Sequence, residues 1–317
     1  MIAKVRVIIP NLDGENWLPK CLDALFKQDY TNFSVTMVDN GSMDDSVKLV
    51  GEKYPQVEIV KHTKNIGICA AVNEIVVRAQ EDYIVVLHND AVTEPEWLRC
   101  MVAQMAEDER IFALAPVHVY QHNPTRVKQA GMGYTLGGTA FGLNLGKKLS
   151  KIKAKNVFAV SDCGTMYRRD IFLHLNGYDE NFFVLGHDVD ICWRAAKAGY
   201  KNVICPEARL VRFRELGAID PDTRARLEAR NNEWTIYKNL PFIQKFCTTW
   251  ILGAAKSRRA ALTKSAKKSY KQGLTEGRKT RRKMCKKFRP KGAFGRNIRI
   301  KWSMARYTFV NMVRFPK

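Results

Sequence analysis

Short apolar runs alternate with amphipathic segments along the first part of the chain. Runs of β-branched, aliphatic and aromatic residues, which are typical of buried strands, cover residues 5–9, 34–38, 83–87 and 112–115. In the segments between them, apolar residues recur with helical spacing at residues 15–26, 68–79 and 96–105. Strands that alternate with helices favour an α/β fold with a largely parallel sheet.

The pattern then loosens and becomes regular again. The uncharged stretch 129–146 contains six glycines, which predicts a loop and a candidate lid and argues against a helix. Ordered elements are predicted at residues 157–160 and 168–175. An amphipathic helix is predicted from Asp188 to Gly199, and a strand at residues 202–205 follows it.

Charge divides the chain into two parts. Of 53 Lys plus Arg and 31 Asp plus Glu, residues 1–240 hold 30 of each sign. Residues 241–317 hold 23 basic residues and a single acid, Glu276. Because 46% of the residues are apolar, a large core can form, which excludes a disordered or fibrous protein. We predict a globular domain at 1–240 and a basic helical extension at 241–317, whose natural partners are polyanions.

The end of this extension has the features of an interfacial helix. Apolar residues recur there at spacings of four, three, four and three, at Ile298, Trp302, Ala305, Phe309 and Met312. A basic helix with Trp and Phe on its apolar face suits an anionic membrane surface. The alternatives are a stripe that packs on the globular domain and a basic run that binds nucleic acid. Nucleic acid is the weaker interpretation, because no RNP, KH or helix-turn-helix signature accompanies the run.

Cysteine usage and hydropathy predict a cytoplasmic protein at the inner face of the cell membrane. The eight cysteines form no C-x-x-C pair and have no histidines at zinc-finger spacing, so we expect no zinc site. The N-terminal residues lack the pattern of a secretory signal. The most apolar segment of the extension, residues 246–255, is shorter than the roughly 20 residues that span a bilayer. We therefore expect reduced cysteines and peripheral membrane association.

Polar side chains follow the predicted strands at the edge where α/β sheets bind ligands. Asp39 can accept hydrogen bonds from a base or ribose there, although an aspartate at this place also opens turns, as Asp44 can cap a helix. Asp90 suits a hard divalent cation, because Mg²⁺ takes one or two carboxylates plus substrate phosphates. The alternative for Asp90 is a loop aspartate without a ligand.

Two aspartates mark the start of the helix predicted from residue 188. Asp188 and Asp190 follow a glycine and a histidine, with an aromatic segment just before them. Helix N-termini attract acids, so both side chains can be simple capping residues. A carboxylate on a rigid helix end that projects into a cleft is also a good general base for an acceptor hydroxyl.

These clusters, in this order, resemble family 2 glycosyltransferases, especially the rhamnosyltransferase-like branch. The matching stretches cover most of the globular part, at residues 7–11, 38–42, 44–46, 65–67, 73, 87–90, 163–169, 177–180, 186–190, 198–200 and 230–232. Any one of these stretches is weakly specific, whereas the ordered set is strongly specific.

The resemblance implies a GT-A fold, a Rossmann-like mixed and mostly parallel sheet flanked by helices, which transfers a sugar with inversion. Asp188 would be the catalytic base, and Asp90 would hold a divalent metal, Mg²⁺ or Mn²⁺. The nucleotide-sugar would contact Pro10, Asn11, Asp39, Asn65, Asn73, Asn89, Asp90 and Arg212. The acceptor side would hold the glycine-rich stretch together with His187, Asp190 and Trp193. The implied partners are a UDP- or dTDP-sugar and a glycan or lipid-linked acceptor in surface polysaccharide synthesis.

Three positions depart from the family pattern. His88 stands where the metal motif commonly has Asp or Asn, and His187 stands before the base where Glu is usual. Arg212 replaces a histidine that can complete the metal site. An arginine cannot bind Mg²⁺ but can neutralise a diphosphate, which predicts a weakened or dispensable metal requirement unless Arg212 lies off the site. The alternative function is a catalytically degraded scaffold or glycan-binding protein.

Overall fold

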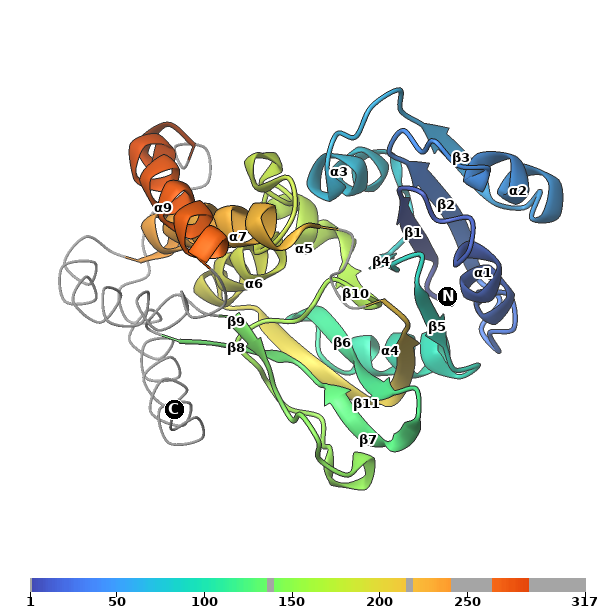
Figure 1. Ribbon diagram of the computed structural model, residues 1–317. Coiled ribbons are helices and arrows are strands. Elements are labelled where there is room, and N and C mark those ends of the chain that lie inside the picture. Colours follow the sequence, from blue (N-terminus) through green and yellow to red (C-terminus); the bar gives the residue numbers. More distant parts are fainter. Residues whose placement is uncertain (1, 136–139, 215–218, 241–263, 285–317) are drawn as a thin grey trace.

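The computed structural model describes residues 2–135, 140–214, 219–240 and 264–284. The strands of its main sheet are β1 (Val5–Asn11), β2 (Phe33–Asp39), β3 (Glu58–Lys61), β4 (Tyr83–Val86), β5 (Ala91–Thr93), β6 (Ile111–Tyr120), β7 (Asn123–Gln129), β10 (Thr165–Arg168) and β11 (Lys201–Arg212). Their order is β3-β2-β1-β4-β10-β6-β11-β5, and β7 pairs with β6 (Figure 1). The strands β1, β2, β3, β4, β6 and β11 point in one direction, whereas β5, β7 and β10 run against them. The predicted α/β fold with a mixed, mostly parallel sheet is confirmed.

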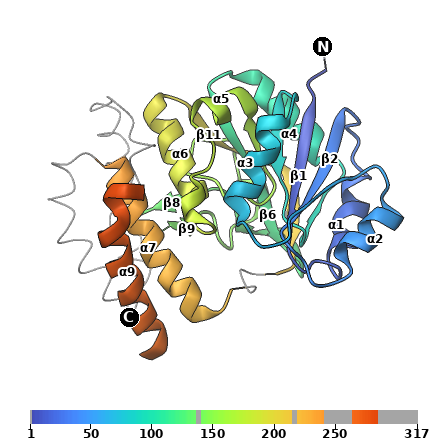
Figure 2. The same ribbon diagram turned by 90° about the horizontal axis from the view of Figure 1, so that it is seen from above.

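Helices cover both faces of this sheet (Figures 1 and 2). One core holds side chains of α1 (Leu18–Leu25), α2 (Ser46–Lys53) and α4 (Trp97–Glu107). The other holds side chains of α3 (Ile68–Arg78), α5 (Arg169–His174), α6 (His187–Ala198) and α7 (Pro221–Asn239). In β1, Val5, Val7 and Ile9 join the first core and Ile8 joins the second. Alternate side chains of a strand point to opposite faces, so one short apolar run supports both layers.

Most predicted elements are found, with changed ends. The strand predicted at 112–115 extends over Ile111–Tyr120, and the strand predicted at 202–205 extends over Lys201–Arg212. The ordered element predicted at 157–160 is neither a helix nor a strand, and isolated bridges at Asn156 and Ala159 pair this segment with its neighbours. Strand ends are set by pairing partners, and those lie far away in the sequence.

The glycine-rich stretch contains strands that its composition did not predict. The strands β8 (Met132–Tyr134) and β9 (Ala140–Gly142) pair in antiparallel fashion, and residues 136–139 between them are outside the described residues. The backbone nitrogen of Met132 also donates to the Ala159 carbonyl (2.8 Å). This part of the stretch is therefore tied to the body of the protein.

Part of the basic extension packs on the globular domain. Helix α9 (Lys264–Met284) lies along α7 (Figures 1 and 2). A Cβ on Gly277 would lie 2.9 Å from the Arg230 carbonyl oxygen, and one on Gly273 would overlap the carbonyl group of Arg226. Only glycine permits such close contact between two helix backbones.

The remaining predictions for the extension are untested. The boundary at residue 240 stays a prediction, and the interfacial helix predicted at 298–312 lies outside the described residues. No helix in the described part of the chain is long and apolar enough to cross a membrane.

Candidate active site

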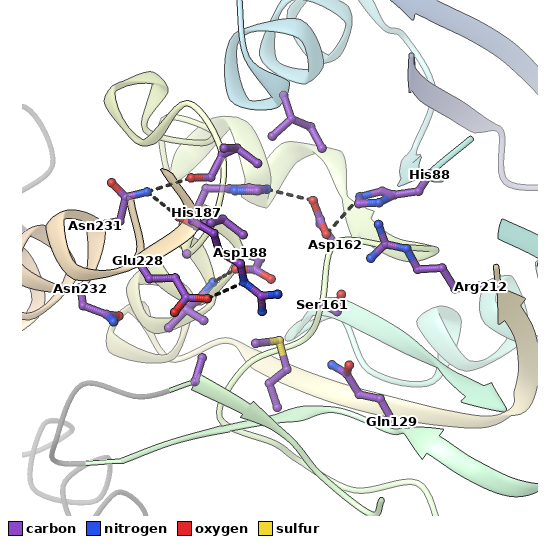
Figure 3. Close-up of a pocket in the computed structure, with 18 residues that line it drawn as sticks. His88, Gln129, Ser161, Asp162, His187, Asp188, Arg212, Glu228, Asn231 and Asn232 are labelled. Carbon is purple, nitrogen blue, oxygen red and sulfur yellow. Dashed lines mark hydrogen bonds and ion pairs between the residues drawn. The ribbon is translucent and has the colours of Figure 1, made fainter. Parts of the chain in front are cut away.

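Two adjoining cavities lie at the carboxyl ends of β1, β4 and β11. The first, called here the strand-end cavity, has a volume of about 280 Å³. Six predicted nucleotide-sugar residues line it, namely Pro10, Asn11, Asn65, Asn89, Asp90 and Arg212. The second, called the helix-side cavity, has a volume of about 250 Å³ and contains Asp188 and His187 (Figure 3). Four residues line both cavities, which therefore meet at Ile68, His88, Val184 and Arg212.

Asn11, at the end of β1, connects the ends of the two neighbouring strands. Its Nδ2 donates to Asp39 Oδ1 (3.1 Å), and its Oδ1 accepts from Asn89 Nδ2 (2.7 Å). Asp39 is buried behind Asn11 and accepts from the backbone nitrogen of Ser42 (3.2 Å), as a turn-opening aspartate does. Asp39 does not line the strand-end cavity, so its contact with a nucleobase stays a prediction.

Asp90 is held by two arginines at the end of the sheet. Arg212 Nε donates to both carboxylate oxygens at 3.2 Å, and Arg214 Nε lies 3.8 Å from Oδ2. Arg214 also donates from Nη2 to Asn89 Oδ1 (3.1 Å). Burial opposes the charge on Arg212, but Cys163, Asp90 and Asp162 outweigh burial and raise its pKa. Arg212 therefore lies on the site and faces a carboxylate.

The side chains around Asp90 do not fit a divalent cation. A cation at Asp90 would lie against the two guanidinium groups that already occupy the carboxylate. Across residues 2–135, 140–214, 219–240 and 264–284, no cluster of three or more His, Cys, Asp or Glu side chains is placed to hold a metal ion.

A buried carboxylate links the two cavities. His187 Nε2 donates to Asp162 Oδ2 (2.9 Å), and His88 Nε2 lies 3.2 Å from Asp162 Oδ1 (Figure 3). Burial alone would raise the pKa of Asp162, but the two imidazoles outweigh burial and hold this pKa well below its usual range. Burial alone would lower the pKa of His187, yet Cys69 and Asp162 raise it well above its usual value.

Asp188 projects into the helix-side cavity from the first turn of α6 (Figure 3). Its Oδ1 accepts from the backbone nitrogen of Val189 (2.8 Å), and Gly186 occupies the N-cap position. Burial and the charge of Asp162 raise the pKa of Asp188 to about 6, although His187 opposes this rise. A carboxyl with this pKa is ionised at neutral pH but still basic enough to accept a proton.

The segment before α6 has a strained backbone that Asn231 holds in place. Phe183 and Leu185 have φ values of 64° and 68°. Asn231 Nδ2 lies within hydrogen-bonding distance of the carbonyl oxygens of Phe182 (3.2 Å), Val184 (2.8 Å) and Leu185 (2.7 Å). Non-glycine residues with such φ values persist only where neighbouring groups hold them. Helix α7 therefore shapes the wall of the cavity next to Asp188.

Three predicted site residues lie elsewhere, which corrects their assignments. Trp193 is fully buried and packs edge-on against Phe158, so it does not face an acceptor. Asp190 is also fully buried, where it pairs with Arg194 (2.9 Å) and Lys238 (3.1 Å). Asn73 accepts from the backbone nitrogen of Tyr178 (2.9 Å) and lines a separate pocket, not the strand-end cavity. Helical periodicity puts Asp190 and Trp193 on other sides of α6 from Asp188.

Several lining residues carried no assignment from the sequence. Besides Asp162 and Asn231, the helix-side cavity is lined by Gln129, Arg224, Glu228 and Asn232, of which Arg224 and Glu228 form an ion pair at 3.0 Å (Figure 3). Asn231 and Asn232 lie in a motif of the resemblance, which was the available signal for them. Asp162 stands in an ordinary polar dipeptide before β10, so its sequence surroundings gave no signal.

Known proteins that are similar in sequence are related to this chain over only part of their own length. A protein of Sinorhizobium fredii, y4gI, and the O-antigen biosynthesis protein RfbC of Myxococcus xanthus are each 27% identical over 220 residues. They match 65% and 66% of this chain, which spans only 24% and 17% of their lengths. The N-acetylglucosaminyl-diphospho-decaprenol L-rhamnosyltransferase of Mycobacterium tuberculosis is 25% identical over 206 residues, with 56% of this chain and 66% of the relative covered.

Solved structures and a family model agree with the fold. GalNAc-T7 with UDP, GalNAc and Mn²⁺ aligns with a TM-score of 0.64 at 13% identity, over 88% of this chain and 57% of that chain. The mannosyltransferase PcManGT of Pyrobaculum calidifontis with GDP-Man and Mn²⁺ gives 0.56 at 17% identity, over 89% and 87%. The fold is thus the GT-A fold. Residues 6–175 match the model of glycosyl transferase family 2, and the chain belongs to this family.

Proposed function

We propose that this glycosyltransferase moves a sugar, with inversion, from a nucleotide-sugar to a hydroxyl acceptor, with Asp188 as the base. The observation that carries the proposal is the meeting of the two cavities. Arg212 lies at the meeting point and borders both the strand-end cavity and the cavity that contains Asp188. A donor in the strand-end cavity would thus present its sugar to an acceptor beside Asp188.

The proposed reaction is a single displacement at the sugar. Asp188 accepts the proton of the acceptor hydroxyl while that oxygen forms a bond to the anomeric carbon. The bond from this carbon to the diphosphate oxygen breaks, and the diphosphate leaves with the electron pair. Arg212 and Arg214 stabilise the charge that develops on the leaving group, because guanidinium groups bind phosphate oxygens in pairs.

A metal is dispensable in this proposal. The similar structures of GalNAc-T7 and PcManGT contain Mn²⁺, whereas here Arg212 and Arg214 lie where a cation would bind Asp90. Sugar transfer should therefore persist in EDTA. The variant Arg212→His should lose rate in EDTA and regain part of it with Mn²⁺, and an unchanged rate and metal response would refute this role.

The acceptor proposed for the helix-side cavity is a lipid-linked glycan of surface polysaccharide synthesis. The amides of Gln129 and Asn232 and the Arg224–Glu228 pair provide both donors and acceptors for sugar hydroxyls. The names of two relatives, an O-antigen biosynthesis protein and a rhamnosyltransferase for a diphospho-decaprenol acceptor, favour this class. We propose a UDP- or dTDP-sugar as the donor.

The outer face of α9 is the proposed contact with an anionic membrane on the cytoplasmic side. Among the described side chains of α9, the exposed charged ones are all cations, at Lys267, Lys268, Lys271, Arg278, Lys279, Arg282 and Lys283. The single acid, Glu276, turns inward and pairs with Arg230 (3.3 Å). Such a face attracts anionic lipid by about 1 kcal/mol per basic residue.

Vesicle binding tests this surface. Replacing Lys267, Lys268 and Lys271 with Gln should weaken binding to phosphatidylglycerol vesicles by about 10- to 100-fold. The matched control replaces the exposed body residues Lys27, Lys53 and Lys61. Equal effects of both triple variants, or binding to RNA but not to vesicles, would refute the proposal.

A donor screen tests the catalytic proposal. Purified protein is assayed for binding and hydrolysis of UDP-, dTDP- and GDP-sugars, with Mn²⁺ or EDTA. Asp188→Asn should abolish turnover and retain donor binding. Asp170→Asn is the matched control, because Asp170 also accepts from the next backbone nitrogen in a first helical turn (2.7 Å) but is exposed. Absence of binding to every donor would favour the degraded scaffold instead.

A further inference from the structure

Asp162 lies between the strand-end cavity and Asp188. The proposed reaction gives this buried carboxylate no role. It lies in the segment before β10, and its side chain is 9% exposed. One carboxylate oxygen faces His88 at the end of β4, and the other accepts from His187 at the start of α6 (Figure 3). Both histidines are among the three positions at which this chain departs from the pattern of its family.

Each of the two histidines is next in sequence to residues of the proposed reaction site. His88 is followed by Asn89 and Asp90, which carry the arginine cluster. His187 is followed by Asp188 in the same helical turn. One carboxylate thus connects the strand end that would hold the diphosphate with the helix end that would hold the base. Asp162 lies between these two histidines (Figure 3).

His187 is enclosed by groups from several elements. Asp162 and the sulfur of Cys69, in α3, interact with its charge, and the ring of Tyr178 packs edge-on at 4.7 Å. Asp188 is its neighbour in α6, and Asp162 in turn is near the charge of Arg212. Of these neighbours, Asp162 is the carboxylate that accepts a hydrogen bond from the ring. A buried imidazole needs such a partner to stay charged and fixed in orientation.

We propose that Asp162 is a positioning residue that fixes the imidazole of His187 beside Asp188 and joins it, through His88, to the strand end that carries Asp90. In place of the usual Glu-Asp pair, this chain has a His-Asp pair, and Asp162 supplies the missing negative charge from another segment. Asp162 does not accept a proton in the reaction. It acts by holding the base at a constant distance from the diphosphate site.

The inference rests on the proposed sugar transfer, and a double-mutant cycle tests it. Asp162→Asn keeps the shape of the side chain but cannot pair with two imidazoles. It should lower turnover about 10- to 100-fold, with a donor KM that changes less than threefold. In the background of His187→Gln, Asp162→Asn should lower turnover little further, because Asp162 acts on Asp188 through His187.

The control is Asp190→Asn, another buried carboxylate of α6 that lies outside both cavities. The effects of Asp190→Asn and His187→Gln on turnover should be additive. Additive effects of Asp162→Asn and His187→Gln on turnover would overturn the inference, because Asp162 would then act independently of His187.

A spectroscopic measurement separates this inference from the proposed function. In ¹⁵N spectra of the full chain recorded across a pH range, the ring of His187, assigned by its loss in His187→Gln, should stay an imidazolium to a higher pH than a free imidazole. In Asp162→Asn it should become neutral at a lower pH than in the wild type, while the ring of His118, which contacts the Cys163 carbonyl, stays unchanged. A His187 ring that titrates like a free imidazole in the wild type would overturn the inference. Lack of any sugar transfer by the wild type, with the expected spectra, would refute the proposed function and not the Asp162 contact.

Discussion

Replacing Asp188 with Asn should stabilise the protein at neutral pH while it abolishes sugar transfer. The carboxyl is partly buried beside Asp162, and its pKa is raised from 3.8 to about 6. Ionisation is therefore less favourable in the folded protein than in the unfolded chain. At 1.36 kcal/mol per pKa unit, this difference amounts to at most about 3 kcal/mol, which partial solvent exposure of the side chain reduces. Asparagine keeps the contact to the Val189 nitrogen and carries no charge.

The sign of the pH dependence follows from the raised pKa. Below about pH 4, Asp188 is protonated in both states, so the charge effect of the substitution is absent. Between pH 4 and 6 the unfolded chain ionises first, and the folded protein loses stability as pH rises. Above pH 6 the loss is complete. The advantage of Asp188→Asn should thus grow from pH 4 to 6 and then stay constant.

Chemical denaturation at pH 4 and pH 7.5 measures this difference. The free energy of unfolding of Asp188→Asn, minus that of the wild type, should rise by at most about 2 kcal/mol between the two pH values. Asp170→Asn, which removes an exposed carboxyl from a similar helical turn, should show little pH-dependent change. If Asp188→Asn is no more stable than the wild type at pH 7.5, burial does not disfavour the ionised form of this carboxyl.

Further substitutions test other parts of the structure. His187→Gln removes the cation that opposes the raised pKa of Asp188, so the acid limb of the turnover–pH profile should move to higher pH; a limb that stays in place would contradict this. Lys238→Met leaves the buried carboxylates of Asp179 (2.5 Å) and Asp190 (3.1 Å) without their common partner, and urea denaturation should show a loss of about 3 to 5 kcal/mol. Gly277→Leu should detach α9 from α7, and faster proteolysis at α9 with an intact body would report it, whereas wild-type resistance would refute the close packing.

The alternation of apolar runs and amphipathic segments determined the α/β fold and the edge of the sheet at which the site lies. Each run of β1, β2 and β4 is apolar on both faces because helices cover both faces. The polar residues that follow these strands, among them Asn11, Asn89 and Asp90, then meet at one edge, and the structure places them together. The local sequence is enough to predict the position of such residues, because parallel strands end at the same edge of the sheet.

Contacts between distant segments could not be predicted in this way. Asp162 lies 74 positions after His88 and 25 before His187, and nothing in its surroundings marks the contact. The resemblance implied an acceptor-side position for Asp190 and Trp193, yet both side chains are buried in the core. The pattern of residues along the chain was enough to predict the fold class, the family and the strand-end residues. Which charges face each other became clear from the folded arrangement alone, because electrostatic partners depend on distance in space and on burial, and the local order of residues specifies neither.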